Sequence, residues 1–72
     1  MERKKLKGKR IALGLTQSHV AEAVGIGRTY YVGIENGKRN GSIKLWLKIL
    51  DVLNIPETQL GEYLKSDEKK GA

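Results

Sequence analysis

The stretch GLTQSHVAEAVGIGRTYYVGIENGKR, residues 14–39, decides the fold of this chain. It holds two short segments with helical apolar periodicity, 16–24 and 28–36, joined by Gly25-Ile26-Gly27. Thr16 is a good helix N-cap because its hydroxyl can accept from a backbone N–H of the first turn, and Gly25 suits the position just beyond a helix C-terminus. The stretch therefore predicts two short helices with the spacing of a helix-turn-helix.

Three further helices are expected around this pair, over residues 3–13, about 43–53 and about 57–64, with Ser42 and Pro56 at the starts of the last two. No segment alternates like a strand, so we predict an all-α domain over residues 4–64 and a polar, frayed tail over 65–72. The residues expected to face the core are Leu6, Arg10, Leu13, Val20, Ala21, Val24, Tyr31, Ile34, Ile43, Trp46, Ile49, Leu50, Leu53, Leu60, Tyr63 and Leu64.

Composition narrows the functions that the chain can have. Its 72 residues carry a formal charge of +6 with a sequence pI of about 9.8, which favours a polyanionic partner. Cysteine is missing, which excludes disulfides and thiolate chemistry. No stretch is apolar enough for a signal peptide or a membrane span, so we expect a cytoplasmic protein with no membrane partner. A chain this short buries little surface, so a second copy is an expected partner.

A helix-turn-helix works only if its second helix is held across the first. We expect Val20, Val24, Ile26 and Ile34 to hold it, so that the outer face of residues 28–36 can enter a major groove about 12 Å wide. That outer face is predicted to be polar and aromatic.

Two sequence blocks are more specific than this spacing: Gly14-Leu15-Thr16-Gln17 and Ile34-Glu35-Asn36-Gly37-Lys38-Arg39. Together with the residues between them, they resemble the Cro/C1-type, or XRE, helix-turn-helix family of phage repressors and bacterial regulators. The resemblance covers about residues 6–55. It implies a five-helix, lambda-repressor-like domain that binds double-stranded, pseudo-palindromic operator DNA as a homodimer and acts as a repressor.

The resemblance also assigns roles to residues. The positions that read base edges correspond to Arg28, Thr29, Tyr30, Val32 and Gly33, and those that contact phosphate correspond to Gln17, Asn36, Lys38, Arg39, Asn40 and Arg10. Arg10 is also expected to pair with Glu35. Because Val32 and Gly33 carry no polar side chain, base reading shifts toward Arg28, Thr29 and Tyr30, and the outward Gly33 suggests a close approach of DNA. Tyr30 could equally pack over the preceding helix.

Other positions keep two interpretations. Ile55, Leu60, Tyr63 and Leu64 are the candidates for a dimer interface but could simply cap the core. The basic run Arg3, Lys4, Lys5, Lys7, Lys9 and Arg10 is either a solvated face or an arm that reaches DNA. Trp46 is expected in the core, with an edge that could reach a dimer contact.

A protein-interaction module of the same fold, for instance an antitoxin-like or anti-regulator protein, is the alternative function. It is supported by the exposed neighbourhood of Tyr30, Tyr31 and Val32 and by the apolar stripe of Leu60, Tyr63 and Leu64. The basic Arg28, Lys38 and Arg39 oppose it. No nucleophile and base lie at a workable spacing, so an enzyme is excluded, and His19 has no second metal ligand near it. We expect no cofactor. The choice among phage repressor, restriction-modification controller and antitoxin stays open, as does a regulatory protein partner.

Overall fold

The computed structural model describes residues 2–65, and over this range every regular element is a helix, as the sequence predicted. The elements in order are α1 (Lys4–Ala12), α2 (Gln17–Val24), α3 (Arg28–Glu35), α4 (Ile43–Val52), a short 3₁₀ helix η1 (Glu57–Gln59) and α5 (Leu60–Leu64). The predicted last helix is thus divided in two, with Pro56 before the 3₁₀ turn. Apart from Lys65, the predicted polar tail lies outside the described residues.

The helix starts follow the predicted caps. The Thr16 hydroxyl accepts from the His19 backbone N–H at 3.0 Å, and the Ser42 hydroxyl accepts from the Leu45 N–H at 3.1 Å. At the end of α2, Gly25 has a φ of +82°, a left-handed conformation that costs glycine little. Local sequence therefore sets the limits of α2 and the start of α4.

One hydrophobic core joins the helices. Trp46, Tyr31 and Leu6 are among its largest fully buried side chains, and the predicted Val20, Ala21, Val24, Ile34, Ile49, Leu50, Leu53 and Tyr63 are buried with them, whereas Leu60 and Leu64 are half buried. The prediction is wrong for two residues. Leu13 is 40% exposed because α1 ends at Ala12, and Ile43 is 56% exposed because it lies on the first turn of α4. The half-buried Leu15 and Leu45 pack against the core instead.

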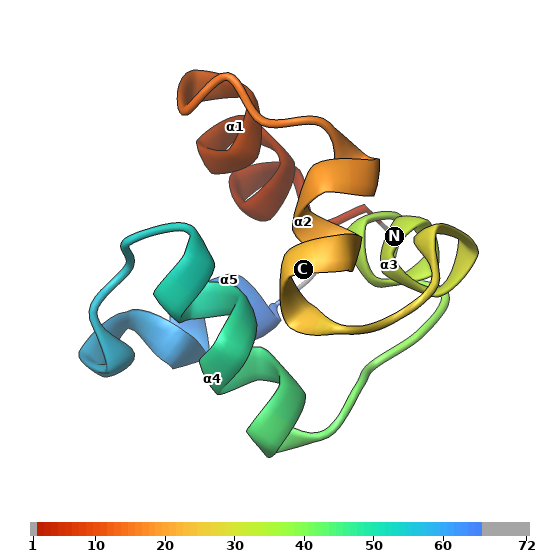
Figure 1. The fold of residues 1–72 in the computed structure, drawn as a ribbon. Helices are drawn as coiled ribbons and strands as arrows, with labels where there is room; N and C mark the ends of the chain where they lie inside the picture. The colour runs from red at the N-terminus through yellow and green to blue at the C-terminus, as the bar shows by residue number, and fades with distance from the viewer. Residues whose placement is uncertain (1, 66–72) are drawn as a thin grey trace.

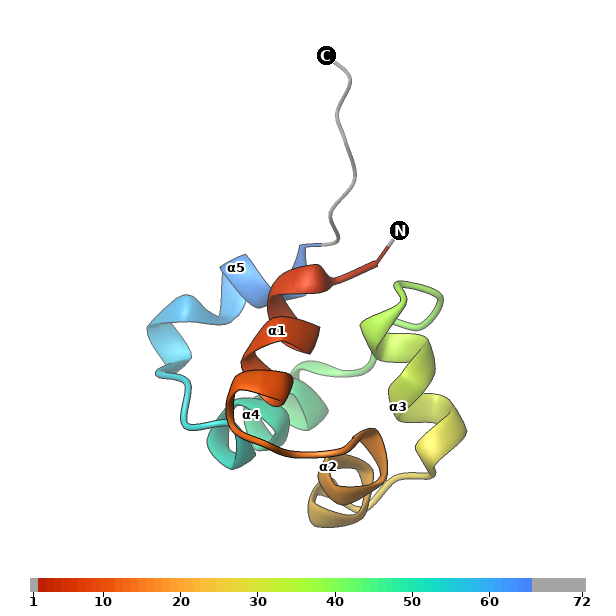
Figure 2. The same cartoon turned by 90° about the horizontal axis from the view of Figure 1, so that it is seen from above.

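The packing of α2 places α3 at the edge of the molecule. α2 packs against both α3 and α4, whereas α5 packs against α4 and η1. In Figures 1 and 2, α3 and α5 consequently lie on opposite sides of the domain. The outer face of α3 is free of the other helices. Among residues 2–65, no helix has the length and apolar character of a membrane span.

Candidate nucleic-acid interface

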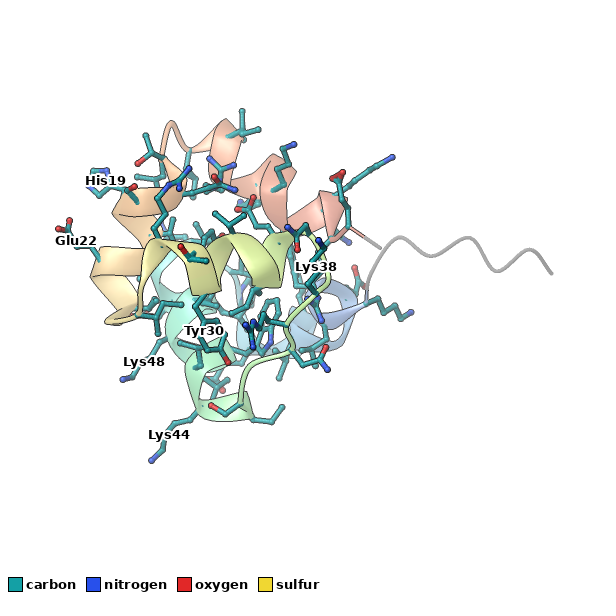
Figure 3. The ribbon with its side chains drawn as sticks, turned by 90° about the vertical axis from the view of Figure 1, so that its right-hand side faces the viewer. His19, Glu22, Tyr30, Lys38, Lys44 and Lys48 are labelled. Carbon is teal, nitrogen blue, oxygen red and sulfur yellow. The ribbon has the colours of Figure 1, made fainter. Side chains whose placement is uncertain are left out.

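The outer face of α3 is the first part of the candidate site. With about 3.6 residues per turn, Thr29, Gly33 and Asn36 lie opposite the buried Tyr31 and Ile34. Figure 3 looks onto this helix with α2 at its N-terminal end. Arg28 and Thr29 are exposed in its first turn, as predicted for side chains that meet a ligand. Gly27, at the N-cap, provides no side-chain cap, so the amides of the first turn are left without one.

Tyr30 lies on one flank of this face. It is 39% exposed, and in Figure 3 it lies on the side of α3 nearer Lys44 and Lys48 of α4, away from His19 on α2. The Arg39 guanidinium lies over its ring at cation–π distance, with 5.7 Å between the guanidinium carbon and the ring centroid. Arg39 is therefore one neighbour of Tyr30 in this structure.

Gly33 lies on the outward side of α3, as expected, but it is not open to a ligand. The residue is buried because the side chain of Arg39 folds back across it, and a Cβ atom at position 33 would lie 2.6 Å from the Arg39 Cγ. The backbone supports this path, since the N–H groups of Lys38 and Arg39 both donate to the Gly33 carbonyl, at 2.8 and 3.0 Å. The loop after α3 is thus folded back onto α3 itself.

A buried ion pair holds the inner side of α3. The Arg10 Nε donates to the Glu35 carboxylate at 2.5 Å, a second nitrogen donates to the same carboxylate at 3.2 Å, and a third bond goes to the Leu15 carbonyl at 2.8 Å. The expected pair of Arg10 and Glu35 is confirmed. Its hydrogen bond to Glu35 raises the pKa of Arg10, so the guanidinium stays charged. Because Arg10 is buried and three of its N–H groups donate within the protein, it fixes α1 against α3.

Gln17 links this pair to the surface. Its side-chain amide donates to the Glu35 carboxylate at 3.2 Å, which fixes the start of α2 against the end of α3. Gln17, Val32, Glu35 and Asn36 line a shallow surface hollow, together with Glu2 and Lys7 from the start of the chain. A polar amide and the half-buried Val32 therefore face a space that an approaching ligand can enter.

Beside the ion pair, the Tyr31 hydroxyl is buried and makes no hydrogen bond of good geometry. Burial raises the pKa of Tyr31, and the nearby Glu35 carboxylate raises it further. Tyr31 therefore belongs to the core, and the suggestion that it forms an exposed patch with Tyr30 and Val32 is wrong.

The loop over residues 36–40 carries the remaining predicted phosphate contacts. Lys38 and Asn40 are exposed, and the Asn36 side-chain oxygen accepts from the Lys38 backbone N–H at 3.3 Å. Figure 3 shows Lys38 at the end of α3 farthest from His19. The basic loop and the first turn of α3 thus lie at the two ends of one helix face.

Sequence reasoning missed the role of Arg3. Instead of forming part of a solvated arm, Arg3 is 5% exposed and its guanidinium lies 5.3 Å from the Trp46 ring centroid. It donates to the carbonyls of Ile34, Leu64 and Arg39 at 2.6, 2.9 and 3.0 Å, and to the Asn40 side chain at 3.1 Å. Burial lowers the pKa of Arg3. Arginine within a run of lysines was a signal for this role, because its planar fork bonds several acceptors at once.

The rest of the basic run remains at the surface, except for the Arg10 already described. Lys4, Lys5 and Lys7 are exposed, and Lys5 pairs with the exposed Glu62 of α5. Of the dimer candidates, Ile55 and Tyr63 are buried within this chain, so an interface here would have to use the half-buried Leu60 and Leu64. Trp46 is fully buried and donates to the Asn40 carbonyl at 2.6 Å, which places it in the core. No cluster of potential metal ligands is found among residues 2–65.

Two short helices, α2 and α3, joined by the turn at Gly25–Gly27, with an exposed face on the second helix flanked by basic and amide side chains, define a helix-turn-helix protein. Comparison with known families agrees: residues 6–60 match the family described as Helix-turn-helix. This chain belongs to that family, in its Cro/C1 or XRE form, a class of DNA-binding transcriptional regulators.

Two similar proteins fit this assignment. The chain is 42% identical over 69 residues to the uncharacterized HTH-type transcriptional regulator YqaF of Bacillus subtilis (strain 168), covering 96% of this chain and 91% of that protein. The crystal structure of the restriction-modification controller protein C.AhdI from Aeromonas hydrophila superposes with a TM-score of 0.75 at 36% identity. That match covers 81% of this chain and 88% of C.AhdI.

Proposed function

We propose that this protein is a transcriptional repressor that binds a pseudo-palindromic operator as a homodimer. The observation that carries the proposal is the free outer face of α3, with Arg28 and Thr29 exposed in its first turn and Lys38 exposed beyond its end. One α3 helix would enter the major groove of each half-site, with half-site centres about 34 Å apart. Bound at a promoter, such a dimer would exclude the polymerase.

Different residues are candidates for the contacts to bases and for the contacts to phosphates. Arg28 can donate two hydrogen bonds to guanine O6 and N7, while Thr29 and Val32 can contact a base edge or a thymine methyl group. Gln17, Asn36, Lys38 and Asn40 would bond phosphate oxygens, which position the protein on the duplex. Arg10, being buried and paired, would act by holding Glu35 and through it Gln17.

The dimer would form through the side of the domain that carries α4 and α5. Ile43 is exposed there, and Leu60 and Leu64 are only half buried, so apolar surface is available for a second copy. α3 takes no part in that side of the domain, so pairing there would leave both α3 helices uncovered (Figure 2). Similarity to C.AhdI favours the restriction-modification controller among the regulatory contexts considered.

Selection from a randomised duplex pool tests the proposal. The wild-type protein should enrich a two-fold symmetric motif, and Arg28→Ala should remove the preference at one position of each half-site. Lys38→Ala should keep the motif but reduce the slope of log affinity against log salt by about one per half-site. Sedimentation at the binding concentrations measures the dimer. Salt-sensitive binding without an enriched motif would contradict the proposal and favour a non-specific binder.

A further inference from the structure

The Arg39 side chain occupies a position on the outer face of α3 where the helix itself has no side chain. In a helix, position 33 lies on the outer face, between Thr29 and Asn36. Gly33 leaves that position empty, and the aliphatic stem of Arg39 occupies the space above its backbone. The guanidinium then reaches the Tyr30 ring, one turn closer to the start of α3. An arginine from the loop thereby lies along the outer face of the helix.

The backbone of Arg39 is fixed on both sides. Its N–H donates to the Gly33 carbonyl at 3.0 Å, and its own carbonyl accepts from the Arg3 guanidinium at 3.0 Å. The next residue, Asn40, is held by Arg3 through its side chain and by Trp46 through its carbonyl. Four hydrogen bonds to well-packed groups therefore fix the backbone from which the Arg39 side chain extends.

The guanidinium itself remains available to a ligand. Arg39 is exposed, and it makes no ion pair with any acidic side chain among the described residues. The guanidinium carbon lies within cation–π distance of the Tyr30 ring, and its N–H groups make no hydrogen bond to the described residues. A cation–π contact limits the conformations of the side chain while leaving its planar fork, which matches guanine O6 and N7, able to donate.

We propose that Arg39 is a specificity-determining residue that reads a base, preferably guanine, in the major groove, in place of the side chain missing at Gly33. This inference rests on the proposed binding of operator DNA and assigns Arg39 to the bases rather than to the phosphate backbone. It also gives Gly33 a function, because any Cβ at this position would displace the Arg39 stem. Tyr30 then serves as the support for Arg39.

The test compares four proteins in selection from a randomised duplex pool: wild type, Arg39→Lys, Gly33→Ala and Gly8→Ala. Arg39→Lys keeps the charge but loses the two-pronged geometry. Gly33→Ala should push the Arg39 stem aside, and the helix propensity of alanine offsets part of that steric cost; melting curves of all four proteins check that each is folded in the assay. Gly8→Ala is the matched control, because it makes the same change in α1, where no atom lies within 4 Å of the added Cβ.

The expected result is a symmetric motif for the wild type and for Gly8→Ala. Arg39→Lys and Gly33→Ala should lose the preference at one and the same position, with discrimination of about 5- to 150-fold reduced to near unity in titrations of single-base variants. The position must differ from the one that Arg28→Ala affects.

Two results would overturn the inference, and they are distinguishable. If the wild type enriches a motif that Arg39→Lys and Gly33→Ala leave intact, Arg39 contacts only phosphate, and the proposed operator binding stands. If the wild type enriches no motif, operator binding fails and the base-reading role fails with it.

Discussion

Removing one partner of the buried Arg10–Glu35 pair should cost about 3–5 kcal/mol of unfolding free energy, because the other charge is left buried without a partner. The side chains are 9% and 3% exposed and share two hydrogen bonds. A domain of 72 residues is typically stable by roughly 4–11 kcal/mol, so this loss is a large fraction of the total. Arg10→Met and Glu35→Gln should each unfold at much lower denaturant concentration than the wild type.

The double variant Arg10→Met/Glu35→Leu separates the cost of a lone charge from the value of the pair. Since both charges are replaced by apolar groups of similar size, its stability should return close to that of the wild type. The coupling energy from the double-mutant cycle should then amount to several kcal/mol. Operator affinity should still fall, because Gln17 loses its bond to Glu35.

Fluorescence of Trp46, the single tryptophan and fully buried, reports urea unfolding. All variants are compared at one protein concentration, because self-association makes stability concentration-dependent. The matched control is the exposed Lys5–Glu62 pair, whose side chains are 52% and 60% exposed and which should show no measurable coupling. Single variants that cost less than about 1 kcal/mol, or a cycle without coupling, would refute the reasoning.

Three further predictions concern two groups that the fold buries, Tyr31 and Arg3. Tyr31→Phe should stabilise the protein by about 1–2 kcal/mol, because it removes a buried hydroxyl without a partner; a lower melting temperature would show that this hydroxyl is bonded. Burial raises the pKa of Tyr31, so as the pH rises the hydroxyl proton is lost from the unfolded chain before it is lost from the folded protein. Above about pH 10 the unfolding free energy of the wild type should therefore fall with pH, by up to about 1.4 kcal/mol per pH unit more than that of Tyr31→Phe. Denaturation of both proteins at pH 9–11 measures this difference. Arg3→Met should lower the unfolding free energy by at least about 2 kcal/mol in the same assay, because the charged hydrogen bonds of Arg3 are lost. The control Lys4→Met removes an exposed side chain and should change the unfolding free energy little. Equal effects of the two variants would contradict the bracing role of Arg3.

Much of the candidate site was predictable because it depends on local chemistry. Thr16 and Gly25 set the ends of α2 through cap geometry, and apolar spacing alone placed Val20 and Ile34 in the core. The pair of Arg10 and Glu35 followed from the family resemblance, which reflects a contact between distant parts of the chain. Periodicity was weaker at helix ends, where Leu13 and Ile43 follow the pattern but extend past the packed surface.

The sequence by itself determined five helical segments, their caps, the helix-turn-helix and the basic character of its exposed side. Only the tertiary structure decided where the long arginine side chains lie. Arg3 is buried because the carbonyls of Ile34 and Leu64, far apart in the sequence, converge on it. Arg39 covers Gly33 because the loop turns back onto α3. An arginine has many rotamers, and the acceptors and surfaces that select one of them exist only after distant segments have packed together.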